Sequence, residues 1–151
     1  MNENQLLEWQ FDELVKTLIV LSYPADKQIE AMGLGQVADE MALDFENYYS
    51  NLYPEYIQRK WITTDQKIAL DKLDQFLRKK SGKKNFTFWE NSQLSIHPDW
   101  EKIRKMAKEI LILLHKDHLT VEVTIKNETI KDENGEELTI QQIITNLINK
   151  K

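Results

Sequence analysis

Apolar residues recur at helical spacing through most of this chain, and the spacing changes to strict alternation at Leu119. A spacing of three and four residues places side chains on one face of an α-helix, whereas a spacing of two places them on one face of a strand. Because only four glycines and three prolines interrupt the 151 residues, long elements are favoured over a many-stranded sandwich. The pattern predicts a mainly α (α+β) protein with a compact bundle of about four helices.

Helices are expected over residues 5–22, 36–53, 63–80 and 98–115. The first should end at Tyr23-Pro24, because the residue before a proline avoids helical backbone angles. Thr63 and Gln66 have the spacing of a capping box, and Pro98 suits the first turn of a helix. The second helix would bury one apolar stripe, which consists of Val37, Met41, Phe45, Tyr48 and Leu52.

The C-terminal part predicts a small β-hairpin followed by a short terminal helix. Residues 119–126 alternate as a half-buried strand does, with valine and isoleucine on one face. Asn134-Gly135 is a strong turn signal, so residues 129–133 and 136–138 are expected to pair. Thr139 and Gln142 have capping-box spacing, which predicts the terminal helix. Since no repeat or linker is recognisable, we expect a single domain over residues 1–151.

Composition argues against several classes of protein. The 20 Lys+Arg and 25 Asp+Glu give a net charge of −5, which makes nucleic acid an unlikely partner for the surface as a whole. The absence of cysteine removes disulfides, thiolate metal sites and cysteine nucleophiles. The longest apolar runs fall far below the ~18 residues that span a bilayer, and the N-terminal residues lack a secretory signal pattern. We therefore expect a cytoplasmic protein with no membrane contact.

Charge is distributed unevenly along the chain. Residues 1–57 carry 2 basic and 11 acidic side chains, a net charge of −9, whereas residues 58–118 carry 14 basic and 8 acidic ones, a net charge of +6. Such polarity can steer a partner of opposite sign, although the two parts can also pair with each other across solvated helix faces.

Acidic side chains on and before the second expected helix form the first candidate site. Glu40 and Asp44 are four residues apart, so their carboxylates share one side of a helix and repel each other. This pattern fits a solvated acidic face, a hard-cation site, an acid/base pair or a surface that mimics phosphate in a basic cleft. The side chains expected to bind a partner are Asp26, Glu30, Asp39, Glu40, Asp44 and Glu46.

A basic segment followed by aromatic residues forms the alternative site. Its cations are Arg78, Lys79, Lys80, Lys83 and Lys84, and Phe86, Phe88 and Trp89 come directly after them. Single-stranded nucleic acid is bound by this combination, because cations contact the backbone and rings stack on bases. The aromatic residues can equally anchor a long loop to the core.

No pattern typical of a catalytic or metal site is present. The three histidines are not arranged as His-Glu-x-x-His, and no Gly-x-Ser-x-Gly, Walker or dinucleotide-binding motif occurs. His115 and His118, near the end of the fourth expected helix, fit a capping role. We therefore expect no catalytic residues, metal or cofactor, and no enzymatic activity.

Four motifs, taken in order, resemble those of small bacterial immunity proteins encoded beside polymorphic and contact-dependent growth-inhibition toxins. They are Gly-Gln-Val-Ala-Asp-Glu-Met-Ala-Leu-Asp-Phe at 35–45, Leu-Asp-Gln-Phe-Leu at 73–77 before Ser81-Gly82, Phe88-Trp89, and Pro-Asp-Trp-Glu-Lys-Ile-Arg at 98–104. The similarity spans about residues 30–115. It implies a helical protein that binds the toxin domain made by its own cell and blocks the toxin's active site.

Three further functions stay open on the residues alone. A nucleic-acid-associated or adaptor module would use the basic 78–84 segment. A small hydrolase would use the 39–46 carboxylates or the histidines. A structural role would need neither the basic segment nor the carboxylates and histidines. The acidic helix favours the inhibitor, because many such toxins are nucleases with basic clefts that an acidic helix can fill.

Overall fold

The computed structural model describes all 151 residues apart from the side chain of Lys83. Its elements, in chain order, are α1 (Glu3–Ser22), α2 (Ala25–Met32), α3 (Val37–Phe45), a π-helical turn (Glu46–Ser50), α4 (Tyr53–Gln58), α5 (Thr64–Arg78), two 3-10 segments (Lys83–Trp89 and Asn91–Gln93), α6 (Pro98–Leu113), β1 (Leu119–Lys131) and β2 (Glu137–Asn149). The predicted fold class, mainly helical with a C-terminal hairpin, is confirmed. No helix in the described part of the chain is both long and apolar enough to cross a membrane.

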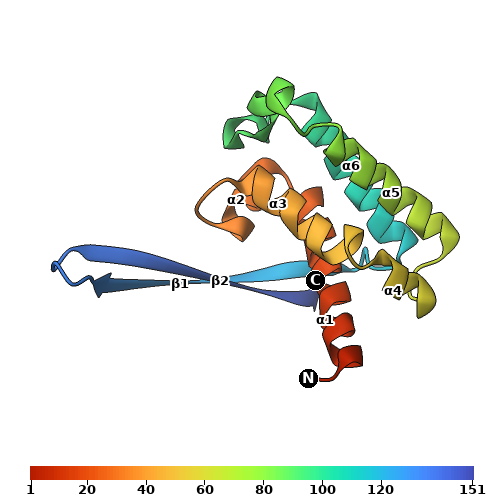
Figure 1. Ribbon diagram of the computed structural model, residues 1–151, viewed down its shortest axis with the longest axis horizontal. Helices are drawn as coiled ribbons and strands as arrows, with labels where there is room; N and C mark the ends of the chain where they lie inside the picture. Colours follow the sequence, from red (N-terminus) through yellow and green to blue (C-terminus); the bar gives the residue numbers. More distant parts are fainter.

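The helical body is built around α1. Leu14, Leu18 and Leu21 on this helix are fully buried, and α1 contacts α6, α3 and both strands. In Figure 1, α5 and α6 run side by side, and α2 and α3 lie between them and the β-ribbon. Trp100 of α6 is the largest fully buried side chain and adds to the same core.

The ends of the helices follow local chemistry. Thr63 accepts a hydrogen bond from the Gln66 N–H while the Gln66 side chain accepts one from the Thr63 N–H, which confirms the predicted capping box. α1 has the same arrangement at Asn2 and Gln5, where no capping box was predicted. The fourth helix begins at Pro98 as expected and ends at Leu113.

The expected helix over residues 36–53 is interrupted. It is divided into α3, a π-helical turn and α4, and a short helix, α2, precedes it where none was expected. The π-helical turn inserts about one residue per turn relative to an α-helix. The buried position after Phe45 is therefore Tyr49, which is 1% exposed, and the predicted Tyr48 is only partly buried.

The predicted terminal helix is wrong, because residues 137–149 form β2. This strand pairs with β1 along its whole length, from Leu119↔Asn149 to Lys131↔Glu137. The turn occupies residues 132–136, and Gly135 adopts a φ of 77°, which suits glycine. The Asp132 side chain accepts hydrogen bonds from the N–H groups of Asn134 and Glu136 and thereby fixes the register. The expected arms at 129–133 and 136–138 are thus parts of two much longer strands.

The ribbon contacts the helical body through its base and, at Gln141 and Ile143, through the α2–α3 connection. Val121 is buried, whereas residues 124–131 of β1 and residues 137–140 of β2 are exposed. In Figure 1 the far end of the ribbon projects beyond the helical body. The C-terminal hairpin is therefore a long arm attached at one end.

Candidate partner-binding surfaces

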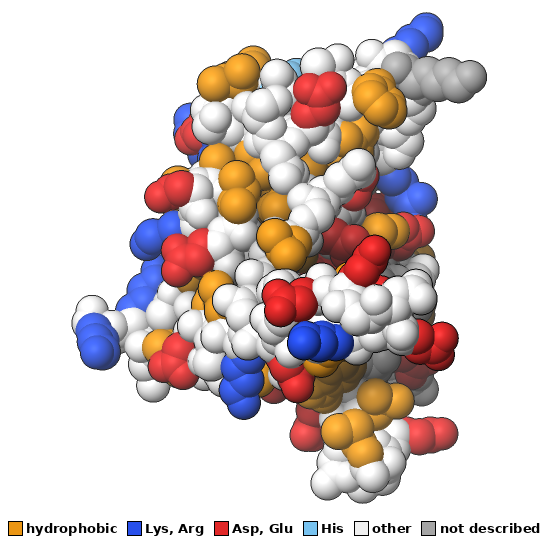
Figure 2. Space-filling model, turned by 90° about the vertical axis from the view of Figure 1, so that its left-hand side faces the viewer, with side chains coloured by type: hydrophobic (Ala, Val, Ile, Leu, Met, Phe, Trp, Pro, Cys, Tyr) orange, Lys and Arg blue, Asp and Glu red, His pale blue; other side chains and the backbone are white. Residues whose placement is uncertain are grey.

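The predicted acidic site does not form one cluster but is divided among three surfaces. Glu40 and Asp44 lie on the side of α3 that faces α1 and the ribbon, where Asp44 lines a small cavity. Asp39 and Glu46 lie on the side that faces the 78–91 segment. Asp26 and Glu30 are on α2. Figure 2, which looks at the molecule from the side of the ribbon tip, shows acidic side chains spread over this face, with hydrophobic and basic ones among them.

Asp44 carries the most perturbed carboxylate of the predicted set. Burial, together with the smaller effect of the neighbouring carboxylates of Glu40 and Glu13, raises its pKa from 3.8 to about 6. Among the side chains that the structure describes, no lysine or arginine forms an ion pair with Asp44 or Glu40. A cation supplied by a partner would therefore stabilise the ionised form of Asp44.

Lys16, which lines the same cavity as Asp44, is already engaged. Lys16 Nζ lies 2.8 Å from Glu13 Oε1 and donates a second hydrogen bond, also of 2.8 Å, to the Thr145 carbonyl oxygen. The cavity that Asp44 lines, about 50 Å³ in volume, is also bounded by Val121 and Thr145 of the ribbon. Glu40, Asp44 and the base of the ribbon thus belong to one surface, which we call the acidic junction (Glu13, Lys16, Glu40, Asp44 and Thr145).

Asp39 lines a different feature, a surface hollow of about 650 Å³ between the start of α3 and the 82–91 segment. Asn91 closes one side of it, because its side chain donates to the Gly35 carbonyl and accepts from the Val37 N–H. Phe86 also lines the hollow and is 74% exposed. This hollow is a second concave surface near α3, separate from the acidic junction.

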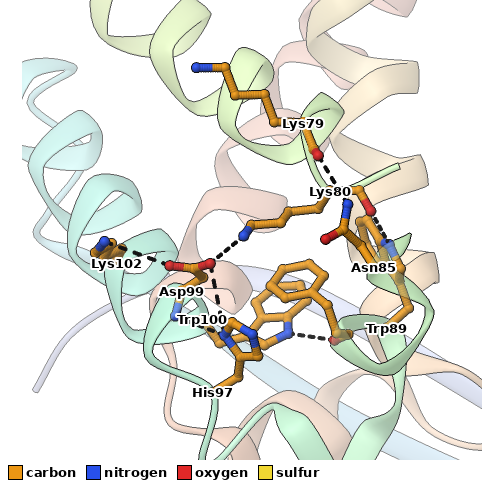
Figure 3. Close-up of polar contacts among 9 residues, drawn as sticks. Lys79, Lys80, Asn85, Trp89, His97, Asp99, Trp100 and Lys102 are labelled. Carbon is orange, nitrogen blue, oxygen red and sulfur yellow. Dashed lines mark hydrogen bonds and ion pairs between the residues drawn. The ribbon is translucent and has the colours of Figure 1, made fainter. Parts of the chain in front are cut away.

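The basic segment is largely tied into the protein. Lys80 forms an ion pair with Asp99 at the start of α6 (Figure 3), and this hydrogen bond lowers the pKa of the Asp99 carboxyl. Arg78 Nε lies 2.9 Å from Asp74 Oδ2. Lys79 and Lys84 are exposed, and the side chain of Lys83 lies outside the described residues. At least two of the five predicted cations are therefore paired within the chain.

Two of the three aromatic residues anchor the segment. The Phe88 ring stacks on Trp100 with ring centroids 4.6 Å apart, and Trp100 Nε1 donates to the Phe88 carbonyl. Trp89 Nε1 donates to the Lys80 carbonyl. Figure 3 shows these groups converging on the first turn of α6. The anchoring interpretation is confirmed for Phe88 and Trp89, and the exposed Phe86 is the exception.

The histidines do not gather into a site. His97 is the N-cap of α6, and its Nδ1 accepts a hydrogen bond from the Asp99 N–H. His115 is exposed and has a φ of 59°, two residues after the end of α6. Among the described residues, no group of three or more His, Asp or Glu side chains is placed to hold a metal ion.

No protein-family model, curated protein or solved structure matches this chain. The surfaces above therefore have to be interpreted from their own chemistry.

Proposed function

We propose that the protein is a bacterial immunity protein, which binds a cognate toxin domain and neutralises it by covering the toxin's active site. The observation that carries the proposal is the acidic junction, where a half-buried carboxylate at Asp44 has two acidic neighbours and no cationic partner within the described residues. A protein designed only for stability would neutralise such a group. A basic nuclease cleft supplies the missing positive charge, and the motif resemblance over residues 30–115 points to the same class of partner.

The alternative, a nucleic-acid-associated or adaptor module that uses residues 78–84, has weaker support. Lys80 and Arg78 are paired with Asp99 and Asp74, so binding a phosphate there would first have to break these contacts. The proposal accordingly assigns the protein no catalytic role, cofactor or metal.

The first test uses the toxin domain that should be encoded immediately upstream of the gene. The purified domain is assayed on RNA and DNA, with and without an equimolar amount of this protein. The proposal predicts a stable complex and loss of nuclease activity. A domain that forms no complex, or that keeps full activity in the complex, would show that the proposal is wrong.

The second test locates the contact surface. The variant Glu40→Lys/Asp44→Asn removes the negative charge of the acidic junction, and Glu109→Lys changes an exposed carboxylate on α6 as a control. We expect the double variant to associate with the toxin roughly tenfold more slowly at low salt and to show a smaller salt dependence. Equal association rates for the double variant and the control would place the interface elsewhere, with the 78–84 segment as the next candidate.

A further inference from the structure

The outer edge of β2 offers unpaired backbone groups. At the two ends of the ribbon, the Lys150 N–H donates to the His118 carbonyl and the Asp132 N–H donates to the Glu136 carbonyl, both at 2.9 Å. Because bonded and non-bonded pairs alternate in an antiparallel ladder, even-numbered residues of β2 bond to β1 and odd-numbered ones direct their backbone groups outward. The carbonyl of Thr145, which accepts from Lys16 on α1, agrees with this alternation.

Beyond Thr145 this edge is open. The outward N–H and C=O groups of Thr139, Gln141 and Ile143 have no hydrogen-bond partner among the described residues. The nearby α2–α3 connection contacts the side chains instead, since the Leu34 N–H donates to Gln141 Oε1. About 20 Å of strand is therefore available for pairing, counted from Glu137 to Ile143 at ~3.3 Å per residue.

The two edges of the ribbon differ in their protection. β1 carries two glutamates and two lysines along its length, and such charges discourage pairing with a further strand. β2 has a single charged residue, Glu137, at its first position, and no proline or glycine. A long, uncharged and exposed edge strand is a template for strand addition.

On the face of the ribbon turned away from the helices, β2 carries several apolar side chains among polar ones. Leu138, Ile140, Ile144 and Ile148 lie on this face, with Gln142 and Asn146 between them. Ile130 of β1 lies opposite Leu138, whereas the other β1 residues of this face are threonines and charged residues. Ile140 and Leu138 are 48% and 50% exposed. Since a two-stranded ribbon is only marginally stable alone in water, a third strand would complete the hydrogen bonds of this edge and place its own side chains beside the apolar ones of β2.

Charge at the two ends of the open edge indicates what kind of strand fits. The tip, residues 131–137, contains four acidic residues and one lysine, and the base adjoins the uncompensated carboxylates of Glu40 and Asp44. A second copy of this chain, paired antiparallel, would bring its own acidic tip toward the acidic junction. A strand with lysine or arginine near both of its ends would instead place a cation beside the acidic tip and another beside Glu40 and Asp44.

From these observations we propose that the outer edge of β2, from Glu137 to Ile143, accepts an extended segment of the toxin domain as a third strand, with basic residues flanking an alternating apolar core. This inference rests on the proposed function, because it takes the toxin as the occupant. It adds to that function a second contact, made mainly through backbone hydrogen bonds, beside the acidic junction.

The first experiment compares two proline variants in binding to the upstream-encoded toxin domain. Thr139→Pro removes one outward N–H of β2, and Thr129→Pro removes one from its register partner on β1. Neither N–H group takes part in the hydrogen bonds between β1 and β2, so we expect both variants to keep the ribbon. We expect Thr139→Pro to weaken binding at least tenfold and Thr129→Pro to change it less than twofold. Equal effects of the two would overturn the strand addition while leaving the proposed function intact.

The second experiment keeps the inference testable if the proline variants fold poorly. Amide hydrogen exchange of the wild-type protein is measured residue by residue, free and with the toxin domain. The inference predicts new protection at Thr139, Gln141 and Ile143, and none at Thr129. New protection on β1 alone, or on neither edge, would contradict it. Protection that rises with protein concentration in the absence of toxin would identify a second copy as the occupant, and no binding of the wild type at all would refute both proposals.

Discussion

Neutralising Asp44 should stabilise the protein at neutral pH and at the same time impair its function. Burial and two acidic neighbours raise the pKa of Asp44 from 3.8 to about 6. Such a carboxyl ionises more readily in the unfolded chain than in the folded protein. Its negative charge therefore opposes folding at every pH above its folded-state pKa of about 6. A difference of about two pKa units corresponds to roughly 3 kcal/mol. Since the side chain is still partly open to water, we discount this to about 1–2 kcal/mol.

The sign of the effect follows from proton linkage. Between pH 4 and 6 the folded protein binds more protons than the unfolded chain at this site, so the free energy of unfolding falls as the pH rises. Asp44→Asn has no proton to release at this site, so this fall in the free energy of unfolding is absent from the variant. We expect the variant to be more stable than the wild type by about 1–2 kcal/mol at pH 7, and the advantage to disappear near pH 4.

The assay is urea unfolding at a series of pH values, with Glu109→Gln as a control. This control removes an equal charge from an exposed position on α6, away from Asp44, and should change stability by less than about 0.5 kcal/mol. Subtracting the wild-type curve from the Asp44→Asn curve cancels the titration of the other groups. A stability difference that is zero at pH 7, or that does not depend on pH, would refute the assignment of an uncompensated carboxylate.

Two further predictions concern the framework that carries these surfaces. Gly33→Ala should destabilise the protein by about 1–3 kcal/mol, because Gly33 has a φ of 79° and an added Cβ would lie 2.0 Å from Ile143 Cδ1. Thermal unfolding checks this, and an unchanged midpoint would contradict the close approach of the α2–α3 connection to the ribbon. Trp100→Ala should cost about 3–5 kcal/mol and release the 83–89 segment, which is measurable as faster proteolysis there. Cleavage at the wild-type rate would mean that Phe88 does not depend on Trp100.

Periodicity and capping chemistry were sufficient to predict most of the helical body. The Thr63–Gln66 box and Pro98 are local signals, so they indicated the starts of α5 and α6 without knowledge of the rest of the fold. The π-helical turn after Phe45 depends on packing against neighbouring helices, and spacing rules for an α-helix cannot place it. This is why the stripe was correct up to Phe45 and then shifted by one residue.

The end of the chain shows how a pairing partner overrides local pattern. Ile140, Ile143, Ile144 and Leu147 satisfy helical spacing, and Thr139 with Gln142 imitates a cap. Yet the segment is rich in isoleucine and threonine, which favour strands, and the Asp132–Gly135 turn brings it directly against β1. A hairpin with a strong turn and a complete register outweighs a cap worth about 1 kcal/mol. The composition of the segment was the signal that could have identified β2.

The candidate surfaces were predictable as residue types but not as groupings. Sequence spacing placed Glu40 and Asp44 on one side of a helix, and they do share a surface. It could not show that Glu13 joins them from α1, nor that Lys80 is paired with Asp99, because these contacts depend on how distant helices pack.

The open edge of β2 and the uncompensated carboxylate of Asp44 meet at Thr145. Its carbonyl ends the protected part of the β2 edge, because Lys16 covers it, and its side of the ribbon bounds the cavity that Asp44 lines. The edge groups stay available for pairing with another strand, whereas the desolvated carboxylate raises the free energy of the free protein. A basic strand laid along β2 would satisfy both sites at once, since its backbone would complete the edge while a flanking lysine or arginine reached Asp44. The adjacency of the two sites is therefore what we expect if one partner binds both, whereas stability alone would favour an acidic junction neutralised by a residue of the chain itself.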